Sequence, residues 1–419
     1  MKRYHTYKDS GIEWLGEIPK HWEVSRIKDI FDQISSNGSE LEENTYVPLE
    51  NIESFTGKLL KKVSNDNNES TNLFKSGDIL LNKLRPYLGK ILLPDFDGGV
   101  SGEVVVLRSN ILFKNDVEPK YFFYRFLSTK FIFKINSLSD GVKMPRTNPT
   151  KILGLEMTVP PFPEQTAIVQ YLDTKTQAID QKVRLLEKKI GCYKELRQSI
   201  INDAVTKGLD NNVALKESGI DWIGQIPEHW EVVRVKELFK ISRGRVIPKT
   251  ELLDDGQFPV YSSQTENEGI LGYINTFDFE TDLITWTTDG VNAGTVFRRK
   301  GKFSCTNICG TLIPKNSKKT SLDYFGYAIA ESTKHNKRID TNGAKIMSNE
   351  MAVIHIIEPP HEEQIAIAQY LDQKTQTIDL ITANIQKQIT ALKELRKTLI
   401  NEVVTGKKRV YEPIENTAV

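Results

Sequence analysis

The chain contains the same set of motifs twice, and this internal repeat constrains its fold more than any other feature. The segment from Tyr7 to Val24 recurs from Leu215 to Val232, with the shared pattern Ser-Gly-Ile-x-Trp-x-Gly-x-Ile-Pro-x-His-Trp-Glu-Val. A second series, Pro-Pro, Glu-Gln, Gln-Tyr-Leu-Asp and Lys-Glu-Leu-Arg, begins at Pro160 and again at Pro359. The order is a short motif, a variable block and a long periodic segment, followed by all three again. A repeat of this length predicts two copies of one structural unit.

The two periodic segments are predicted to be long helices. After Glu164 and after Glu363, apolar side chains recur at spacings of three, four and seven residues, which is typical of a coiled-coil seam. Prolines lie only at the helix starts, where a missing N–H costs nothing. A helix of about 43 residues is roughly 64 Å long, more than a compact domain needs. We therefore favour a two-helix spacer over ordinary core helices.

The blocks between the motifs, roughly residues 25–155 and 233–355, are predicted to be domains of one fold. In both blocks short strands alternate with turns, and a short helical segment follows near Tyr121 and near Asp323. The two blocks differ from each other far more than the flanking motifs do. This indicates a shared scaffold that carries different ligand-binding surfaces.

The predicted fold class is α+β, with two pseudo-repeated α/β domains separated and joined by two long antiparallel coiled-coil helices. The predicted divisions are residues 1–160 for the N-terminal motif and first domain, 161–210 for the first helix, 211–358 for the linker motif and second domain, 359–410 for the second helix, and 411–419 for a C-terminal tail.

Composition excludes several classes of protein. The formal net charge of +1 argues against a protein that coats nucleic acid indiscriminately, so any DNA affinity has to be local or shared with a partner. Three cysteines are too few for a disulfide framework, which favours a reducing, cytoplasmic setting. We expect no signal peptide and no membrane span, since no stretch approaches the roughly 18 apolar residues that a span needs.

The twin motifs resemble those of the specificity subunits of Type I restriction-modification systems, and the resemblance covers nearly the whole chain. It implies that residues 25–155 and 233–355 are target recognition domains, each of which reads one half of a split site in double-stranded DNA. It further implies that the helices set the gap and dock two methyltransferase subunits, which use S-adenosylmethionine to modify adenine. Two restriction subunits would add cleavage driven by ATP and Mg²⁺. This chain would carry no catalytic residue and no cofactor of its own.

Candidate DNA-contacting residues come from loops at matching places in the two blocks. Direct readout needs hydrogen-bonding side chains at base edges and basic groups at phosphates. In the first block the candidates are Lys83, Arg85, Tyr87, Lys90, Ser101, Lys143 and Arg146. In the second they are Thr287, Thr288, Asn292, Thr306, Asn307 and Lys345, within loops 286–292, 304–307 and 342–345. The alternative is that such polar loops are merely solvated turns.

Three further features have structural interpretations. The run from Arg298 to Lys300 is expected to contact phosphate at a hairpin tip or to form a solvated face. Trp14, Trp22, Trp222 and Trp230 are expected to pack between each short motif and the helix ends. Cys305 and Cys309 have a zinc-like spacing, but no second pair completes a site, so they are expected to be core or loop residues.

Other functions remain as alternatives. Pro94-Asp95 followed by Glu118-Pro119-Lys120 matches a nuclease spacing, but Pro119 would interrupt the strand that this chemistry needs. The sequence contains no Gly-x-x-x-x-Gly-Lys-Ser/Thr motif for phosphate binding, so it gives no indication of an ATPase. A coiled-coil scaffold would explain the helices but not two divergent domains. The recognition subunit of a Type IIB-like restriction enzyme would have the same sequence features.

Overall fold

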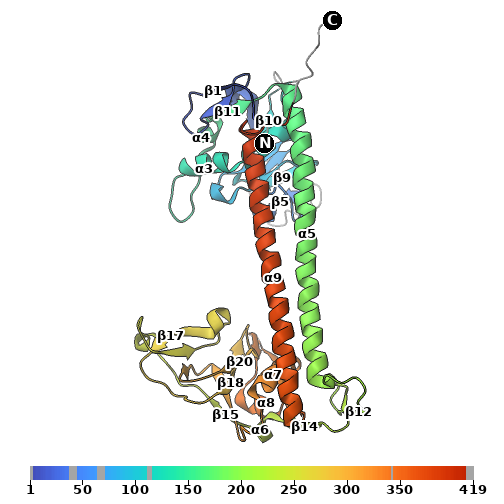
Figure 1. Ribbon diagram of the computed structural model, residues 1–419. Helices are drawn as coiled ribbons and strands as arrows, with labels where there is room; N and C mark the ends of the chain where they lie inside the picture. Colours follow the sequence, from blue (N-terminus) through green and yellow to red (C-terminus); the bar gives the residue numbers. More distant parts are fainter. Residues whose placement is uncertain (1–2, 37–44, 64–70, 111–115, 341–342, 412–419) are drawn as a thin grey trace. The chain divides into compact units, whose positions relative to one another are not determined.

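The computed structural model describes residues 3–36, 45–63, 71–110, 116–340 and 343–411 (Figure 1). These residues form two compact units. Unit 1 contains residues 1–187 and 386–419, and unit 2 contains residues 188–385. Of the predicted C-terminal tail, residues 412–419 lie outside the described residues.

Unit 1 is a mixed α+β domain. Its core sheet is antiparallel and four-stranded, in the order β4-β10-β7-β8, and a three-stranded sheet in the order β5-β9-β6 adjoins it. Before the long helix its elements are β1 (Tyr7–Asp9), β2 (Glu17–Pro19), β3 (Glu23–Arg26), α1 (Ile27–Ile30), β4 (Phe31–Ile34), β5 (Tyr46–Val47), β6 (Thr71–Phe74), β7 (Ile79–Asn82), β8 (Ile91–Leu92), β9 (Gly98–Ser101), β10 (Val104–Ser109), α2 (Pro119–Leu127), α3 (Thr129–Ser137), α4 (Pro149–Leu153) and β11 (Glu156–Val159).

Unit 2 repeats this plan. Its four-stranded antiparallel sheet has the order β15-β22-β18-β20, and β14 pairs with β25 as β3 pairs with β11 in unit 1. Its elements are β12 (Leu215–Glu217), β13 (Gln225–Pro227), β14 (Glu231–Arg234), α6 (Val235–Leu238), β15 (Phe239–Arg243), β16 (Phe258–Tyr261), β17 (Ile270–Ile274), β18 (Leu283–Thr287), β19 (Asp289–Gly290), β20 (Val296–Arg299), β21 (Ser304–Cys305), β22 (Cys309–Pro314), α7 (Leu322–His335), β23 (Arg338–Asp340), β24 (Gly343–Lys345), α8 (Ser348–Val353) and β25 (His355–Glu358). The prediction of two tandem domains of mixed helix and sheet is confirmed.

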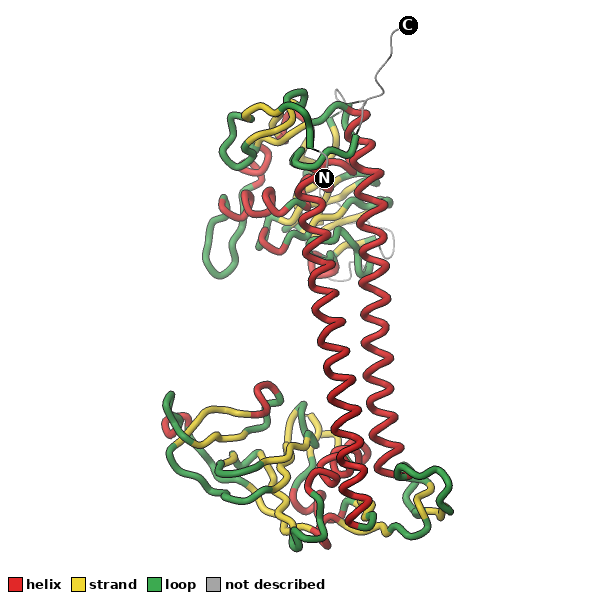
Figure 2. Tube along the Cα trace, in the orientation of Figure 1, coloured by secondary structure: helices red, strands yellow, loops and turns green. Residues whose placement is uncertain are grey.

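The two periodic segments are continuous helices, α5 (Phe162–Lys207) and α9 (His361–Val404) (Figure 2). Within unit 1, Asp180 of α5 pairs with Arg396 of α9 at 3.1 Å, and Glu187 pairs with Lys393 at 3.3 Å. Position on α9 falls as position on α5 rises, so the two helices run antiparallel there. Although both helices are long, no helix among the described residues is apolar enough over a sufficient length to cross a membrane.

The short repeated motif of each unit packs against the end of a long helix. Trp22 is fully buried in one core with Val403 and Val404 of α9, and Trp230 is fully buried in the other core with Val205 of α5. The helix ends are followed by glycines at positive φ, where a Cβ would lie 3.3 Å or less from the tryptophan ring in each case. The expected packing at helix ends is therefore correct for these two tryptophans.

The other two tryptophans of the motifs are partly buried and also contact the variable blocks. Trp14 lies against Phe131 of α3, and Trp222 stacks on His335 of α7 with ring centroids 4.5 Å apart. These ring partners belong to the variable blocks, while both tryptophans also border the cores that contain the ends of the long helices. Each short motif thus joins a helix end on one side to a variable domain on the other.

We predict that Trp230→Ala lowers the free energy of unfolding by about 3–5 kcal/mol, because it leaves a large cavity between the short motif and α5. Chemical denaturation of the full chain measures this loss. Leu185→Ala, at an exposed position of α5, is the matched control and should change stability little. Equal effects of the two substitutions would contradict the structural importance of Trp230.

Candidate nucleic-acid interface

The three loop stretches predicted to contact DNA meet at one junction in unit 1. The Lys83 amide donates to the carbonyl of Glu103 at 3.0 Å, and the Thr147 amide donates to the carbonyl of Lys83 at 2.9 Å. The Arg85 amide donates to the carbonyl of Pro145 at 2.6 Å. The end of β7, the turn before β10 and the segment before α4 are therefore joined through their backbones.

Unit 2 contains the same junction. The Thr288 amide donates to the carbonyl of Ile308 at 3.0 Å, and the Ile346 amide donates to the carbonyl of Thr288 at 2.9 Å. Lys83 and Thr288 are equivalent, since each follows the last residue of the strand that pairs with β10 or β22. The backbone arrangement is repeated while the side chains on it differ.

The predicted side chains of unit 1 fall into an exposed group and a half-buried group. Lys143, Arg146 and Tyr87 are exposed, whereas Lys83, Arg85, Lys90 and Ser101 are half-buried. Arg146 forms two hydrogen bonds with the carboxylate of Glu103, at 2.7 and 3.0 Å. The ammonium of Lys90 donates to the carbonyls of Leu49 and Glu50 at 2.8 and 3.2 Å, and burial lowers its pKa. Lys90 is thus occupied by the protein itself.

In unit 2 the loops are where the sequence predicted, but several hydroxyls point inward. Thr287, Thr288 and Thr306 are buried, and the hydroxyl of Thr288 donates to the carbonyl of Ile308. A buried hydroxyl does not reach a base edge in this conformation. Asn307 is exposed and Asn292 is half-buried.

Lys345 is half-buried, and its ammonium lies 3.9 Å from a carboxylate oxygen of Asp289. The backbones of Lys345 and Asp289 pair between strands β24 and β19. In unit 1 the backbones of Arg146 and Leu84 form a comparable isolated β-bridge. Asn342, at the start of the predicted loop, lies outside the described residues.

Sequence reasoning did not select the exposed apolar side chains in or near these loops, of which Ile339 belongs to strand β23. Val142 is 101% exposed, Val291 is 94% exposed and Ile339 is 89% exposed. Val142 and Val291 each follow a glycine at positive φ, within the tripeptide Asp-Gly-Val. The repeated tripeptide Asp-Gly-Val, with an apolar residue after a turn glycine, is the sequence signal that could have identified these exposed side chains. Apolar side chains beside donors suit contact with the methyl groups of thymine.

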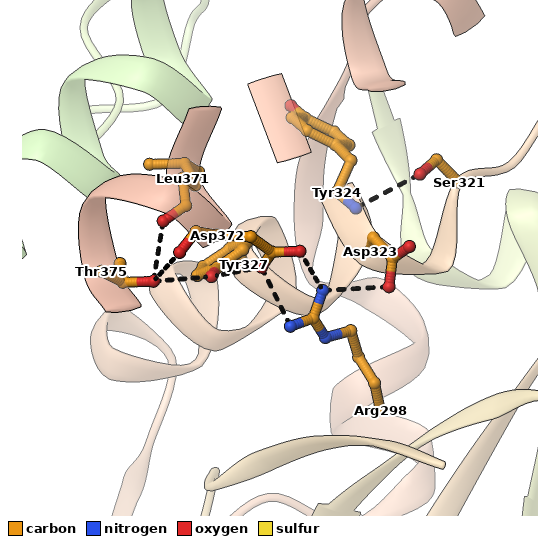
Figure 3. Close-up of polar contacts among 8 residues, drawn as sticks. All are labelled: Arg298, Ser321, Asp323, Tyr324, Tyr327, Leu371, Asp372 and Thr375. Carbon is orange, nitrogen blue, oxygen red and sulfur yellow. Dashed lines mark hydrogen bonds and ion pairs between the residues drawn. The ribbon is translucent and has the colours of Figure 1, made fainter. Parts of the chain in front are cut away.

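The Gln-Tyr-Leu-Asp motif anchors each long helix to its domain (Figure 3). In unit 2 the carboxylate of Asp372 accepts a hydrogen bond from the Tyr327 hydroxyl at 2.7 Å and pairs with Arg298 at 3.1 Å. In unit 1 Asp173 accepts from the Tyr124 hydroxyl at 2.7 Å and pairs with a lysine of α2. The repeated aspartate therefore has a structural role in both units.

The same geometry corrects the interpretation of the run from Arg298 to Lys300. Arg298 is held between Asp372 and Asp323, the latter at 2.9 Å (Figure 3). Arg299 is buried, with its guanidinium 3.6 Å from the ring centroid of Tyr261. Arg299 is buried and has protein partners, so the expectation of a phosphate contact or solvated face is wrong for Arg299. Arg298 and Lys300 are exposed, which agrees with a solvated face, although Arg298 is also paired with carboxylates.

The Glu-Gln motif forms side-chain hydrogen bonds in the first turn of each long helix. The side-chain amides of Gln165 and Gln364 donate to the carbonyls of the prolines five residues earlier, at 2.9 and 2.8 Å. The neighbouring carboxylate of Glu164 lies 2.7 Å from the ring of His21, and Glu363 lies 2.7 Å from the ring of His229. The twin His-Trp and Glu-Gln motifs are thus partners in one joint.

Glu118, Pro119 and Lys120 of the nuclease-like spacing have structural roles. Pro119 begins helix α2, Glu118 accepts a hydrogen bond from the Lys120 amide as the helix cap, and the Lys120 ammonium pairs with Asp173 at 2.7 Å. The segment is a helix rather than the strand that was considered. In the described part of the chain, no group of three or more His, Cys, Asp or Glu residues could hold a metal ion.

Comparison with known proteins shows the family. The family model of the Type I restriction modification DNA specificity domain matches residues 19–188 and 227–391. The chain belongs to this family, since the two matches cover most of its length. The class defined by the fold and the repeated junction is therefore the DNA specificity component of Type I restriction-modification systems.

Individual relatives agree with this. A Mycoplasma pneumoniae protein assigned as a type I specificity subunit is 36% identical over 169 residues, which span 40% of this chain and 54% of that relative. The MjaX specificity subunit assigned in Methanocaldococcus jannaschii is 27% identical over 94% of this chain and 96% of its own length. A chain solved in work on the assembly and conformational transition of the type I R-M system has a TM-score of 0.71 at 19% identity, covering 92% of this chain and 98% of that one, and supports the fold.

We predict that Cys305 and Cys309, which are buried and free, resist alkylation at pH 8 while the exposed Cys192 reacts. Burial raises the pKa of the Cys309 thiol to about 11, so little thiolate forms until the pH approaches that value. Burial also raises the pKa of Cys305. Mass spectrometry after iodoacetamide treatment should find one modified cysteine in the native chain and three after unfolding. Rapid native labelling of Cys309 would contradict its burial.

Proposed function

We propose that this chain is the sequence-specific DNA-binding subunit of a Type I restriction-modification complex, in which each unit reads one half of a bipartite site. The observation that carries this proposal is the repeated junction, which presents different side chains on one backbone arrangement. A repeated scaffold with divergent exposed groups is what two different half-sites require, because phosphate contacts position a protein and base contacts give it specificity.

The long helices are proposed to set the gap between the half-sites as an antiparallel coiled-coil spacer, and to dock two methyltransferase subunits. Those subunits would use S-adenosylmethionine to modify adenine, and two restriction subunits would use ATP and Mg²⁺. This chain is proposed to be non-catalytic. The same features serve a Type IIB-like recognition subunit, and the genes beside this one distinguish the two settings.

The test is a methylome. The chain is co-expressed with its neighbouring methyltransferase subunit in a host that lacks adenine methylation, and modified adenines are mapped by sequencing. A split motif that appears only when both genes are present supports the proposal. Exchange of residues 25–155 for another such domain should then change one half-site only. Methylation by the partner alone, or a change in both halves after the exchange, would refute the proposed role.

Lys143→Ala should weaken DNA binding by roughly ten-fold at low salt and reduce the slope of log affinity against log salt by about one. Lys143 is exposed beside the junction, so its ammonium is placed to neutralise a phosphate and its loss should not affect folding. Fluorescence anisotropy with the methyltransferase complex measures both quantities. Lys28→Ala, at an exposed position of α1 near the other end of β10 from the junction, is the control and should leave binding unchanged. A loss confined to one DNA sequence would identify Lys143 as a base-reading residue instead.

A further inference from the structure

The arginine that ends the second Lys-Glu-Leu-Arg motif clamps a loop of the first domain to the helices. The side chain of Arg396 is only 7% exposed. Its guanidinium donates to the carbonyls of Phe55 and Thr56 at 2.9 and 3.1 Å, and it pairs with Asp180 of α5 at 3.1 Å. Lys58, in the same loop, also pairs with Asp180, at 2.7 Å. The buried guanidinium of Arg396 therefore joins α9, α5 and the loop of residues 53–58.

The loop of residues 53–58 has two residues with positive φ, and its backbone conformation depends on the groups packed around it. Phe55 has φ of +61°, in the left-handed region that non-glycine residues seldom adopt. Gly57 also has positive φ, and a Cβ there would lie 2.1 Å from the ring of Phe123. A strained conformation of this kind persists only when neighbouring groups hold it. The two hydrogen bonds from Arg396 are made at the strained residue and at the one that follows it.

The loop in turn supports the candidate DNA-contacting loop of residues 82–90. The Phe55 amide donates to the carbonyl of Gly89 at 3.0 Å, and the Lys90 ammonium donates to the carbonyl of Leu49 at 2.8 Å. Phe55 also packs on Gly89, where a Cβ would lie 3.0 Å from its ring. A continuous chain of contacts thus runs from Arg396 through Phe55 to Gly89, and packed side chains and hydrogen bonds of this kind carry energetic coupling within a domain.

The first Lys-Glu-Leu-Arg motif provides a natural comparison. Its arginine, Arg197, is 38% exposed and pairs with Asp379 of α9 at 3.3 Å. In the described part of unit 2, no hydrogen bond joins its guanidinium to a backbone carbonyl. The same motif residue therefore pairs with the partner helix in both units, but it holds a loop of the domain only in unit 1.

We propose that Arg396 is a positioning residue for recognition of the half-site read by the first domain, and that it acts by holding loop 53–58 behind loop 82–90. This inference rests on the proposed function. A planar guanidinium suits the role, because it can donate to two carbonyls and a carboxylate together, whereas an ammonium lacks this fork. Reading of the second half-site does not depend on Arg197 in this way.

The test uses the full chain in complex with its methyltransferase partner and compares Arg396→Met with Arg197→Met. Methionine keeps much of the volume of the arginine stem. Asp180 still has Lys58 as its partner, so no buried carboxylate is left uncompensated. Two quantities are measured: hydrogen exchange at the Phe55 amide and across residues 82–90, and methylation of DNA sites that carry single substitutions in either half.

Arg396→Met is expected to raise exchange across both segments by about ten-fold or more, which is the scale set by loss of charge-assisted hydrogen bonds. Discrimination against substitutions in the first half-site should fall by a similar factor, while the second half-site is read as before. Arg197→Met should change neither quantity. Unchanged exchange in a folded Arg396→Met variant, or equal loss at both half-sites, would overturn the proposal.

Arg396→Lys provides the second variant if the methionine form does not fold. This variant keeps a positive charge beside Asp180 but loses the planar guanidinium that donates to two carbonyls. It should therefore raise hydrogen exchange and lower first-half-site discrimination by smaller factors than Arg396→Met. Hydrogen exchange equal to that of the wild type in this variant would overturn the proposal. Failure of the proposed function is separately visible, since the wild-type complex would then methylate no split site while the exchange result still decides whether the clamp exists.

Discussion

Both units depend on the burial of one tryptophan against the end of a long helix. Trp22 closes unit 1 against the end of α9, and Trp230 closes unit 2 against the end of α5. A fully buried indole of this size contributes several kcal/mol, which is a large part of the stability of a typical domain. The histidine before each tryptophan contacts a glutamate in the first turn of a long helix. The short motif is therefore the joint at which a helix start, a helix end and a variable domain meet.

The sequence predicted the architecture well because its strongest signals are periodic or repeated. The predicted first helix, residues 161–210, differs from α5 by one residue at its start and three at its end, and the twin motifs predicted two units of one fold. Side-chain direction was harder to predict. Thr288 and Arg299 lie in the predicted regions but point into the core, and only the positions of neighbouring strands decide that direction. The clamp at Arg396 was also beyond prediction, since the residues it joins lie far apart in the sequence.

The repeated junction separates two requirements that would otherwise compete. Backbone hydrogen bonds around Lys83 and Thr288 fix the position of three loops, and they do so whichever side chains those loops carry. The side chains can then differ between the units without loss of the fold. The carboxylates beside the exposed cations, such as Glu103 beside Arg146, hold the basic groups in place. They also limit the local positive charge, in keeping with a chain of formal net charge +1.

Unit 1 is assembled from the two ends of the chain, which has a consequence for synthesis on the ribosome. Residues 188–385 supply all of unit 2, so that unit has its whole sequence before translation ends. The core around Trp22 lacks Val403 and Val404 until translation has passed the whole of unit 2. At about 5–20 residues per second, the first domain to be synthesised waits roughly ten seconds or more with an apolar surface uncovered. A chain that stops before Val403 leaves that surface uncovered, so the packing of unit 1 depends on the last turns of α9.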